Sequence, residues 1–160
     1  MLRLLRWAPA ASWMFLIFSF STEVGAPQRT SRFFEPFFRG IFPTISPEQL
    51  DFLHLLFRKA GHLTEYAILA ALLWWALDPS RHGQGSNRKR SIMAFLLSVL
   101  YAATDEFHQA FVPARGAAVT DVLIDATGAA LSLLAIAGIL ILAKRWGAQE
   151  FLGRFGVRCY

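Results

Sequence analysis

Cysteine is almost absent from this sequence, and charged residues are scarce. The single cysteine, Cys159, is the next-to-last of 160 residues. An intramolecular disulfide and a structural zinc site built on thiolates are therefore both excluded. Only 17% of the residues are charged, whereas 55% are hydrophobic. A soluble domain of this size carries more charge and distributes it along the chain, so the composition indicates a membrane protein.

The net charge of +5 does not indicate a nucleic-acid-binding protein. The sequence contains no RNA- or DNA-binding motif, and its basic residues lie between apolar stretches. The tendency of lysine and arginine to gather in cytoplasmic loops explains these residues better. We therefore expect membrane lipids and no nucleic acid among the partners, and the sequence identifies no protein partner.

Four apolar segments have about the 20 residues that a membrane-spanning helix needs. They cover residues 7–24, 53–77, 91–112 and 119–143. The two tails and the loop after the second segment carry ten lysines or arginines, against six on the opposite side. The four segments predict an all-α polytopic membrane protein with four transmembrane helices and a single domain over residues 1–160. The bias in lysine and arginine predicts that both termini lie in the cytoplasm. Trp74, Trp75 and Trp146 are expected to anchor the helices at the cytoplasmic interface.

The first segment has an alternative interpretation as a secretory signal peptide. It follows basic residues and ends in the small residues Gly25 and Ala26. Pro27 would then come directly after the cleavage point, which disfavours cleavage. Cleavage would leave three helices, and the second helix would still begin outside.

The loop between the first two segments contains apolar side chains at helical spacing. They are Phe33, Phe34, Phe37, Phe38, Ile41 and Phe42. This pattern predicts a short amphipathic helix in the outer headgroup region, which is compatible with a lid packed on the helix bundle. Farther along, Ser46 and Gln49 match a capping box and Pro47 suits a first helical position. The second helix is therefore predicted to begin near Pro47.

Ionisable and amide side chains interrupt three of the apolar segments, all toward the predicted outer end. They are Lys59, His62 and Glu65, then Asp105, Glu106, His108 and Gln109, then Asp121 and Asp125. Counting about 1.5 Å per residue from the cytoplasmic ends places them all in the outer half of the hydrocarbon core. Charge inside lipid costs a few kcal/mol, so such residues usually face the protein interior and mark a site. We expect one outward-facing polar site.

Helical spacing predicts which of these residues point the same way, because positions three or four apart share a face. The groups are Lys59, His62, Glu65 and Tyr66; Asp105, His108 and Gln109; and Asp121, Asp125, Gly128 and Ser132. Glu106 falls off the stripe of its helix and is expected to face a neighbouring groove or the headgroups. Gly128 and Ser132, four residues apart, predict the close approach of a neighbouring backbone.

Arg115 lies on a tight loop between Pro113 and Gly116, above the carboxylates. Its guanidinium could hold a substrate phosphate or carboxylate through two parallel hydrogen bonds. Alternatively, Arg115 could pair with Asp121 and latch the loop. The sequence favours neither alternative.

Three interpretations of the polar cluster compete. In the first, His62 and His108 transfer protons while Glu65 and Asp105 orient them, which makes these four the catalytic candidates. The substrate-binding candidates are then Lys59, Tyr66, Glu106, Gln109, Arg115, Asp121 and Asp125. In the second, the i, i+3 pairs His62–Glu65 and Asp105–His108 hold a metal ion; we favour this less and predict no cofactor. In the third, the cluster is structural and fixes the helix register. The number of polar residues at one depth favours a functional site.

Two motifs in this cluster resemble those of the VanZ-like family. The first is Lys59-Ala-Gly-His62-Leu-Thr-Glu65-Tyr66, and the second is Thr104-Asp105-Glu106-Phe-His108-Gln109 with Pro113-Ala-Arg115 and Asp121-Val-Leu-Ile-Asp125. The resemblance covers about residues 50–140. Ala114 and Ser132 stand where the family often has glycine, and both changes keep a small residue.

The resemblance implies a multi-pass protein of the bacterial cytoplasmic membrane. The family is named for a protein of teicoplanin resistance, and no settled reaction comes with it. We expect this chain to bind or modify a lipid-linked component of the cell envelope, whose anionic headgroup would meet Arg115 and Lys59. The alternative is a non-catalytic scaffold or amphiphile-binding protein with a structural polar cluster. A transporter fits poorly, because the inner halves of the segments offer few polar residues.

Overall fold

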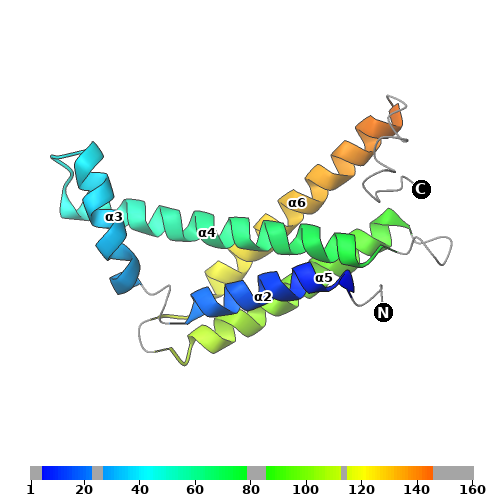
Figure 1. Cartoon of the computed structure of the whole chain (residues 1–160), viewed down its shortest axis with the longest axis horizontal. Coiled ribbons are helices and arrows are strands. Elements are labelled where there is room, and N and C mark those ends of the chain that lie inside the picture. Colours follow the sequence, from blue (N-terminus) through cyan, green and yellow to red (C-terminus); the bar gives the residue numbers. More distant parts are fainter. Residues whose placement is uncertain (1–4, 23–26, 79–85, 113–114, 146–160) are drawn as a thin grey trace.

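Every regular element in the described part of the chain is an α-helix (Figure 1). The computed structural model describes residues 5–22, 27–78, 86–112 and 115–145. The helices are α2 (Ala8–Ser21), α3 (Pro27–Ile41), α4 (Pro47–Ala76), α5 (Asn87–Gln109) and α6 (Val119–Arg145). The predicted all-α class is confirmed, and each of the four predicted segments coincides with a helix.

Capping residues determine where two of these helices begin. The Ser46 side chain accepts a hydrogen bond from the backbone N–H of Gln49, and the Gln49 side chain accepts one from the backbone N–H of Ser46. The predicted start of α4 at Pro47 is therefore confirmed. The Ser86 side chain accepts a hydrogen bond from the backbone N–H of Arg88. This cap starts α5 at Asn87, four residues earlier than the predicted 91.

Helix α3 lies across the amino-terminal part of α4 (Figure 1). The ring of Phe34 lies 4.3 Å from that of Phe57 and 5.2 Å from that of His54, measured between centroids. Phe33 and Phe37 remain exposed. One face of α3 thus packs on α4 as a lid, while its placement among lipid headgroups stays a prediction.

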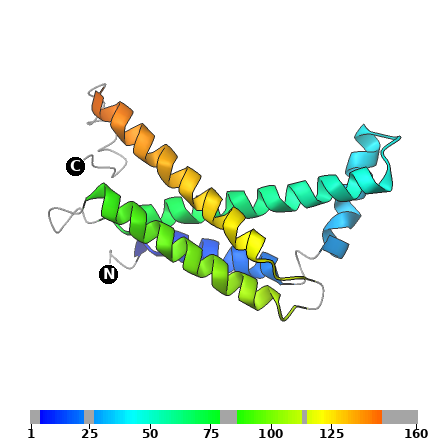
Figure 2. The same cartoon turned by 180° about the vertical axis from the view of Figure 1, so that it is seen from behind.

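Helices α4, α5 and α6 form the centre of the molecule, and α6 crosses α4 and then diverges from it (Figure 2). Gly128 lies at this crossing. A Cβ atom added to Gly128 would lie 2.1 Å from the backbone oxygen of Leu63. The predicted close approach at Gly128 is therefore confirmed. The crossing fixes how near the polar side chains of the two helices come to each other.

Helix α2 packs against α4 and α5. The Trp13 indole donates a hydrogen bond to the backbone oxygen of Glu65 at 2.9 Å, and the Tyr101 hydroxyl donates one to the backbone oxygen of Met14 at 2.6 Å. Ile17 is almost fully buried. In this structure, α2 is therefore an integral part of the bundle.

Far from α3, a buried ion-pair cluster joins α4 to α5. Asp78 pairs with Arg6 at 3.0 Å and with Arg90 at 3.5 Å. The Arg90 guanidinium lies 3.4 Å from the ring centroid of Trp74 and donates a hydrogen bond to the Trp74 backbone oxygen. Trp74 is only 4% exposed, so its predicted role as an interface anchor is wrong. Trp146 lies outside the described residues.

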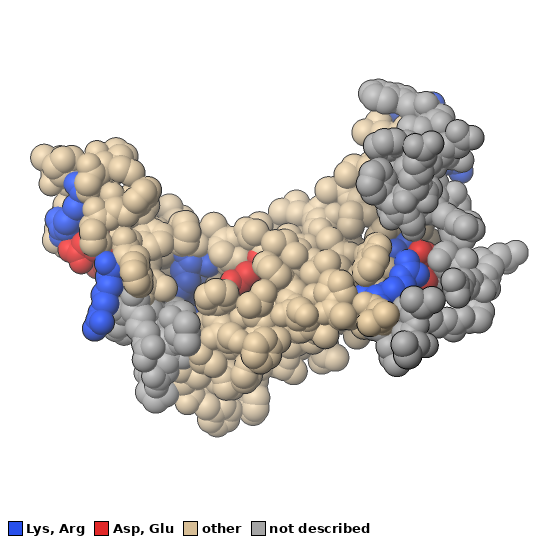
Figure 3. All heavy atoms as spheres, in the orientation of Figure 1, with Lys and Arg blue, Asp and Glu red and all other residues tan. Residues whose placement is uncertain are grey.

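Charged side chains gather in separate places on the face shown in Figure 3: over α3, near the middle of the molecule and at the ends of α4 and α5. Among the described residues, one helix, α6, is long and apolar enough to cross a membrane by itself, and α2 is apolar but shorter. Helices α4 and α5 contain most of the predicted polar site, which lowers their overall hydrophobicity. The predicted four-span topology is thus supported only in part.

Candidate functional site

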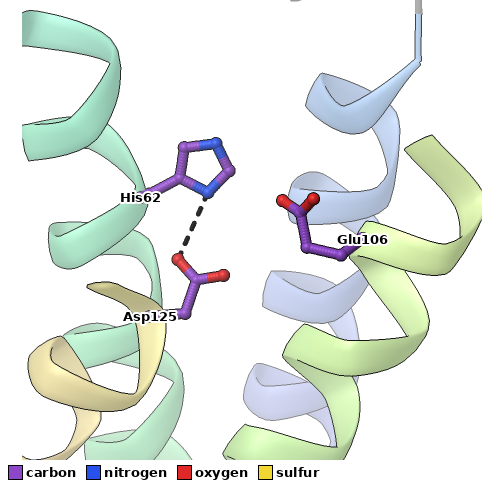
Figure 4. Close-up of side chains that lie close together, drawn as sticks. All are labelled: His62, Glu106 and Asp125. Atoms are coloured by element: carbon purple, nitrogen blue, oxygen red, sulfur yellow. Dashed lines mark hydrogen bonds and ion pairs between the residues drawn. The ribbon is translucent and has the colours of Figure 1, made fainter. Parts of the chain in front are cut away.

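Three helices bring His62, Asp125 and Glu106 together (Figure 4). Nδ1 of His62 on α4 lies 3.2 Å from Oδ1 of Asp125 on α6. Glu106 on α5 faces this pair, and one nitrogen or oxygen atom from each of the three side chains lies within 4.8 Å of the other two. All three residues are buried. They form the interior part of the site.

The buried position of Glu106 corrects the sequence prediction that it faces a groove or the headgroups. Glu106 is 5% exposed, and its Oε2 accepts a hydrogen bond from the backbone N–H of Ala118 at 2.9 Å. Helix α5 packs against both α4 and α6. Helix α5 therefore has two buried faces, whereas the three- and four-residue spacing of Asp105, His108 and Gln109 predicted only one.

Asp121 lies one helical turn before Asp125 on α6 and forms a second layer of the site. Its Oδ1 lies 2.7 Å from Nζ of Lys59, and its Oδ2 lies 3.4 Å from a guanidinium nitrogen of Arg58. Helices α4 and α6 run in the same direction, so the order Lys59, His62 along α4 matches the order Asp121, Asp125 along α6. Lys59 is therefore occupied by an ion pair, and Arg58, which the sequence analysis left out of the site, belongs to it.

Arg115 ties the loop before α6 to α2 and α5. It donates a hydrogen bond to the side-chain oxygen of Gln109 at 3.4 Å and another to the backbone oxygen of Phe20. Gln109 in turn donates to Asp105 at 3.0 Å. The alternative in which Arg115 pairs with Asp121 is wrong. Burial, followed by the nearby charge of Arg58, lowers the pKa of Arg115 from its ordinary value.

Two other predicted site residues, His108 and Tyr66, form no described hydrogen bond with the His62 cluster. The His108 ring is half-buried and lies 4.7 Å from the ring of Phe18 on α2, with no hydrogen bond to its Nε2 from the described residues. Tyr66 is fully buried, and its hydroxyl has no hydrogen-bond partner among them either. The structure thus joins only one of the two predicted histidines to the central carboxylates.

A pocket of about 190 Å³ opens where α3 crosses α4. Its polar lining consists mainly of Arg58, His62, Glu65 and Arg115, and its apolar lining of Phe20, Phe34 and Phe57. The pocket thus combines two guanidinium groups, the imidazoles of His54 and His62 and a carboxylate with aromatic rings. Such a lining suits a ligand with an anionic end and an apolar end.

Several buried polar atoms of the site, carboxylate oxygens as well as the Tyr66 hydroxyl, lack a hydrogen-bond partner among the described residues. One carboxylate oxygen on each of Asp105, Glu106 and Asp125 is buried without a hydrogen-bond partner among the described residues. Buried polar atoms are normally satisfied, so unpaired oxygens at three neighbouring positions indicate that a proton, a cation or a donor group belongs there.

Comparison with known proteins identifies one family. The sequence model of the family described as VanZ/LLP1 matches residues 7–142. No curated protein matches the chain. No solved structure matches it. The matched region contains every predicted site residue, and it also contains α2, which the motifs over about 50–140 left out.

Proposed function

The chain belongs to the VanZ/LLP1 family, and on this basis we propose that it is a multi-pass protein of the bacterial cytoplasmic membrane that holds an anionic amphiphile in an outward-facing site. The ligand we propose is a lipid-linked component of the cell envelope. The observation that carries this proposal is the pocket in which Arg58, His62 and Arg115 adjoin Phe34 and Phe57.

The distribution of polar and apolar side chains supports a membrane location. Large apolar residues such as Phe15 on α2, Leu100 on α5 and Leu134 on α6 are exposed, whereas Asp105 and Asp125 are buried. A surface this apolar suits contact with lipid. Ion pairs such as Lys59–Asp121 reduce the cost of placing ionisable residues within α4 and α6, which is why we retain a four-span topology.

The positions of the basic residues support the orientation. Arg6, Arg88 and Lys144 lie at the helix ends remote from the pocket. Lysine and arginine favour the cytoplasmic side, so the pocket would open outward. In this orientation α4 would run along the membrane normal, and α3, which lies across α4, would lie near the membrane surface. The exposed Phe33 and Phe37 would then lie among the outer headgroups.

The size and charge of the pocket favour a small anionic headgroup. Its volume of about 190 Å³ is below the roughly 300 Å³ at which pockets for drug-sized ligands begin. A phosphate or carboxylate group would enter, while the acyl chains would remain beside α3 and α4. We assign contact with the headgroup to Arg115 and Arg58, because both guanidinium groups line the pocket whereas Lys59 does not.

His62 is the best-placed group for proton transfer. It lines the pocket, and Asp125 orients its ring from behind at 3.2 Å. A carboxylate in this position stabilises the protonated imidazole, which is the arrangement that general acid–base catalysis uses. We therefore assign any proton transfer to His62, with Glu65 as the second titratable group of the pocket wall.

The second candidate is a non-catalytic protein that binds an amphiphile or scaffolds an envelope enzyme. The contacts of Lys59 with Asp121 and of Arg115 with Gln109 and Phe20 favour it, because they hold helices and loops together. In this candidate, single changes in the cluster weaken function gradually. Catalysis predicts instead that loss of His62 abolishes it.

Envelope lipid analysis in a deletion strain tests the proposal. The strain is complemented with the wild-type gene, His62→Ala, Arg115→Gln or the control Arg39→Gln, which alters an arginine of α3 that pairs only with Glu35 among the described residues. We expect His62→Ala and Arg115→Gln to reproduce the deletion profile while accumulating normally in membranes, and Arg39→Gln to match wild type. Teicoplanin susceptibility is measured in parallel.

The other outcomes separate the candidates. A changed susceptibility with an unchanged lipid profile in the deletion strain would favour the amphiphile-binding candidate. Failure of both pocket variants to accumulate would favour a purely structural cluster. No change in either property on deletion would refute the proposal.

A further inference from the structure

We propose that His62, Glu106 and Asp125 form a binding site for one divalent metal ion of the manganese or zinc type. The three side chains come from α4, α5 and α6 and point toward one another (Figure 4). One potential ligand atom from each lies within 4.8 Å of the other two. This trio differs from the pairs His62–Glu65 and Asp105–His108 that the sequence suggested for a metal.

Charge balance is the first argument for a cation. Asp125 is 1% exposed and Glu106 is 5% exposed, and each has one oxygen without a hydrogen-bond partner among the described residues. Of the basic side chains near the trio, Lys59 and Arg58 form their ion pairs with Asp121, and Arg115 donates its hydrogen bonds to Gln109 and to the backbone oxygen of Phe20. Burying a carboxylate without a compensating charge is costly. One divalent ion would balance two carboxylates and use both free oxygens.

Ligand chemistry narrows the kind of ion. One imidazole nitrogen and two carboxylate oxygens suit zinc, manganese or ferrous iron, whereas magnesium and calcium favour oxygen ligands alone. Two atoms that each lie about 2.1 Å from an ion are at most about 4.2 Å apart. The observed limit of 4.8 Å therefore requires only a small side-chain adjustment.

The surrounding structure orients the ligands. The backbone N–H of Ala118 donates a hydrogen bond to Oε2 of Glu106, leaving Oε1 free. The close contact of Gly128 with Leu63 fixes the distance between α4 and α6, and so between His62 and Asp125. A partner for a ligating carboxylate and a fixed helix spacing are both properties of preorganised metal sites.

Three protein ligands leave coordination positions open, as in catalytic metal sites. Because His62 also lines the pocket, these positions would be accessible from it. They would accept water or an oxygen of an anionic headgroup. With an ion bound, the imidazole of His62 would be a neutral ligand, and proton transfer would fall to Glu65, the second titratable group of the pocket wall. The headgroup contact and this proton transfer rest on the proposed function, whereas the metal site itself does not.

Metal titration of the purified full chain in detergent micelles tests the site. After chelator treatment, manganese and, separately, zinc are added without any lipid ligand. We expect one ion per chain, and at least a roughly tenfold loss of affinity in His62→Ala, Glu106→Gln and Asp125→Asn. Asp51→Asn is the control, because Asp51 is an exposed carboxylate of α4 outside the trio. It should keep the wild-type affinity.

Pulsed electron paramagnetic resonance of the manganese-loaded protein gives a readout that does not depend on a variant folding. We expect nitrogen modulation from a single imidazole in the wild type, and the same signal in His108→Ala. The absence of saturable binding of either ion to the wild-type chain would overturn the proposal. So would an equal loss of affinity in Asp51→Asn, or loss of the nitrogen signal in His108→Ala. No lipid ligand is present in these measurements, so a failure to bind metal would not count against the proposed lipid function.

Discussion

The contact between Gly128 and Leu63 makes a sharp prediction about the substitution Gly128→Ala. The new Cβ atom would lie 2.1 Å from the backbone oxygen of Leu63 and 2.9 Å from its backbone carbon. Backbone atoms in the middle of a helix cannot rotate away as a flexible side chain can. The two helices α4 and α6 must therefore separate.

The structure gives the scale of that separation. Reaching an ordinary contact of 3.4 Å requires a shift of about 1.3 Å. If the helices move as rigid bodies, the 3.2 Å contact of His62 with Asp125 lengthens to about 4.5 Å, beyond a hydrogen bond. Overpacking of this kind costs about 1–3 kcal/mol. Alanine favours a helix over glycine by about 1 kcal/mol, so we expect a net loss of about 1 kcal/mol, and at most about 2 kcal/mol.

Gly138→Ala is the matched control on the same helix, because a Cβ atom at Gly138 meets nothing within 4 Å. It should stabilise the protein by up to about 1 kcal/mol. Both variants are compared with the wild type by equilibrium unfolding of the full chain in mixed detergent micelles, followed by circular dichroism. Equal stabilities for Gly128→Ala and Gly138→Ala would refute the close α4–α6 contact and the spacing of the site.

Two further predictions concern the ion pairs. Lys59→Met and Asp121→Asn should each destabilise the chain. The double variant should lose less stability than the sum of the two, with a coupling energy of about 1–3 kcal/mol in the same unfolding assay. A coupling energy of zero would contradict the 2.7 Å contact. In that assay, Asp78→Asn should lower the free energy of unfolding by about 3 kcal/mol, because it leaves Arg90 buried without its countercharge. A neutral substitution at the exposed Glu48 should lower it little. Equal losses for the two variants would contradict the burial of the Asp78–Arg90 ion pair.

The helices and their starts were predictable because their causes are local. The Ser46–Gln49 capping box fixes the start of α4 whatever the rest of the chain does. Apolar length and helical spacing identified the segments in the same way. The start of α5 was missed because the cap at Ser86 lies before the apolar stretch used to define that segment.

The partners of the site residues were much less predictable. Spacing along one helix assigns a residue to a face, but it does not say how many faces are buried. Helix α5 buries two faces, and Glu106 lies on the one that does not contain Asp105. Arg115 contacts Gln109 and Phe20 rather than Asp121, because the loop before α6 packs against the end of α2. Trp74 is buried because Arg90 from the next helix covers its ring.

The sequence by itself determined the helical class, the family and the approximate level at which the ionisable residues gather, since these depend on composition, periodicity and motifs along the chain. Only the tertiary structure decided that His62 meets Asp125 and Glu106 while His108 lies against Phe18. Such pairings depend on how far each helix is rotated and where it crosses its neighbours. A close contact such as that of Gly128 with Leu63 sets those quantities, and residues distant in the sequence supply it.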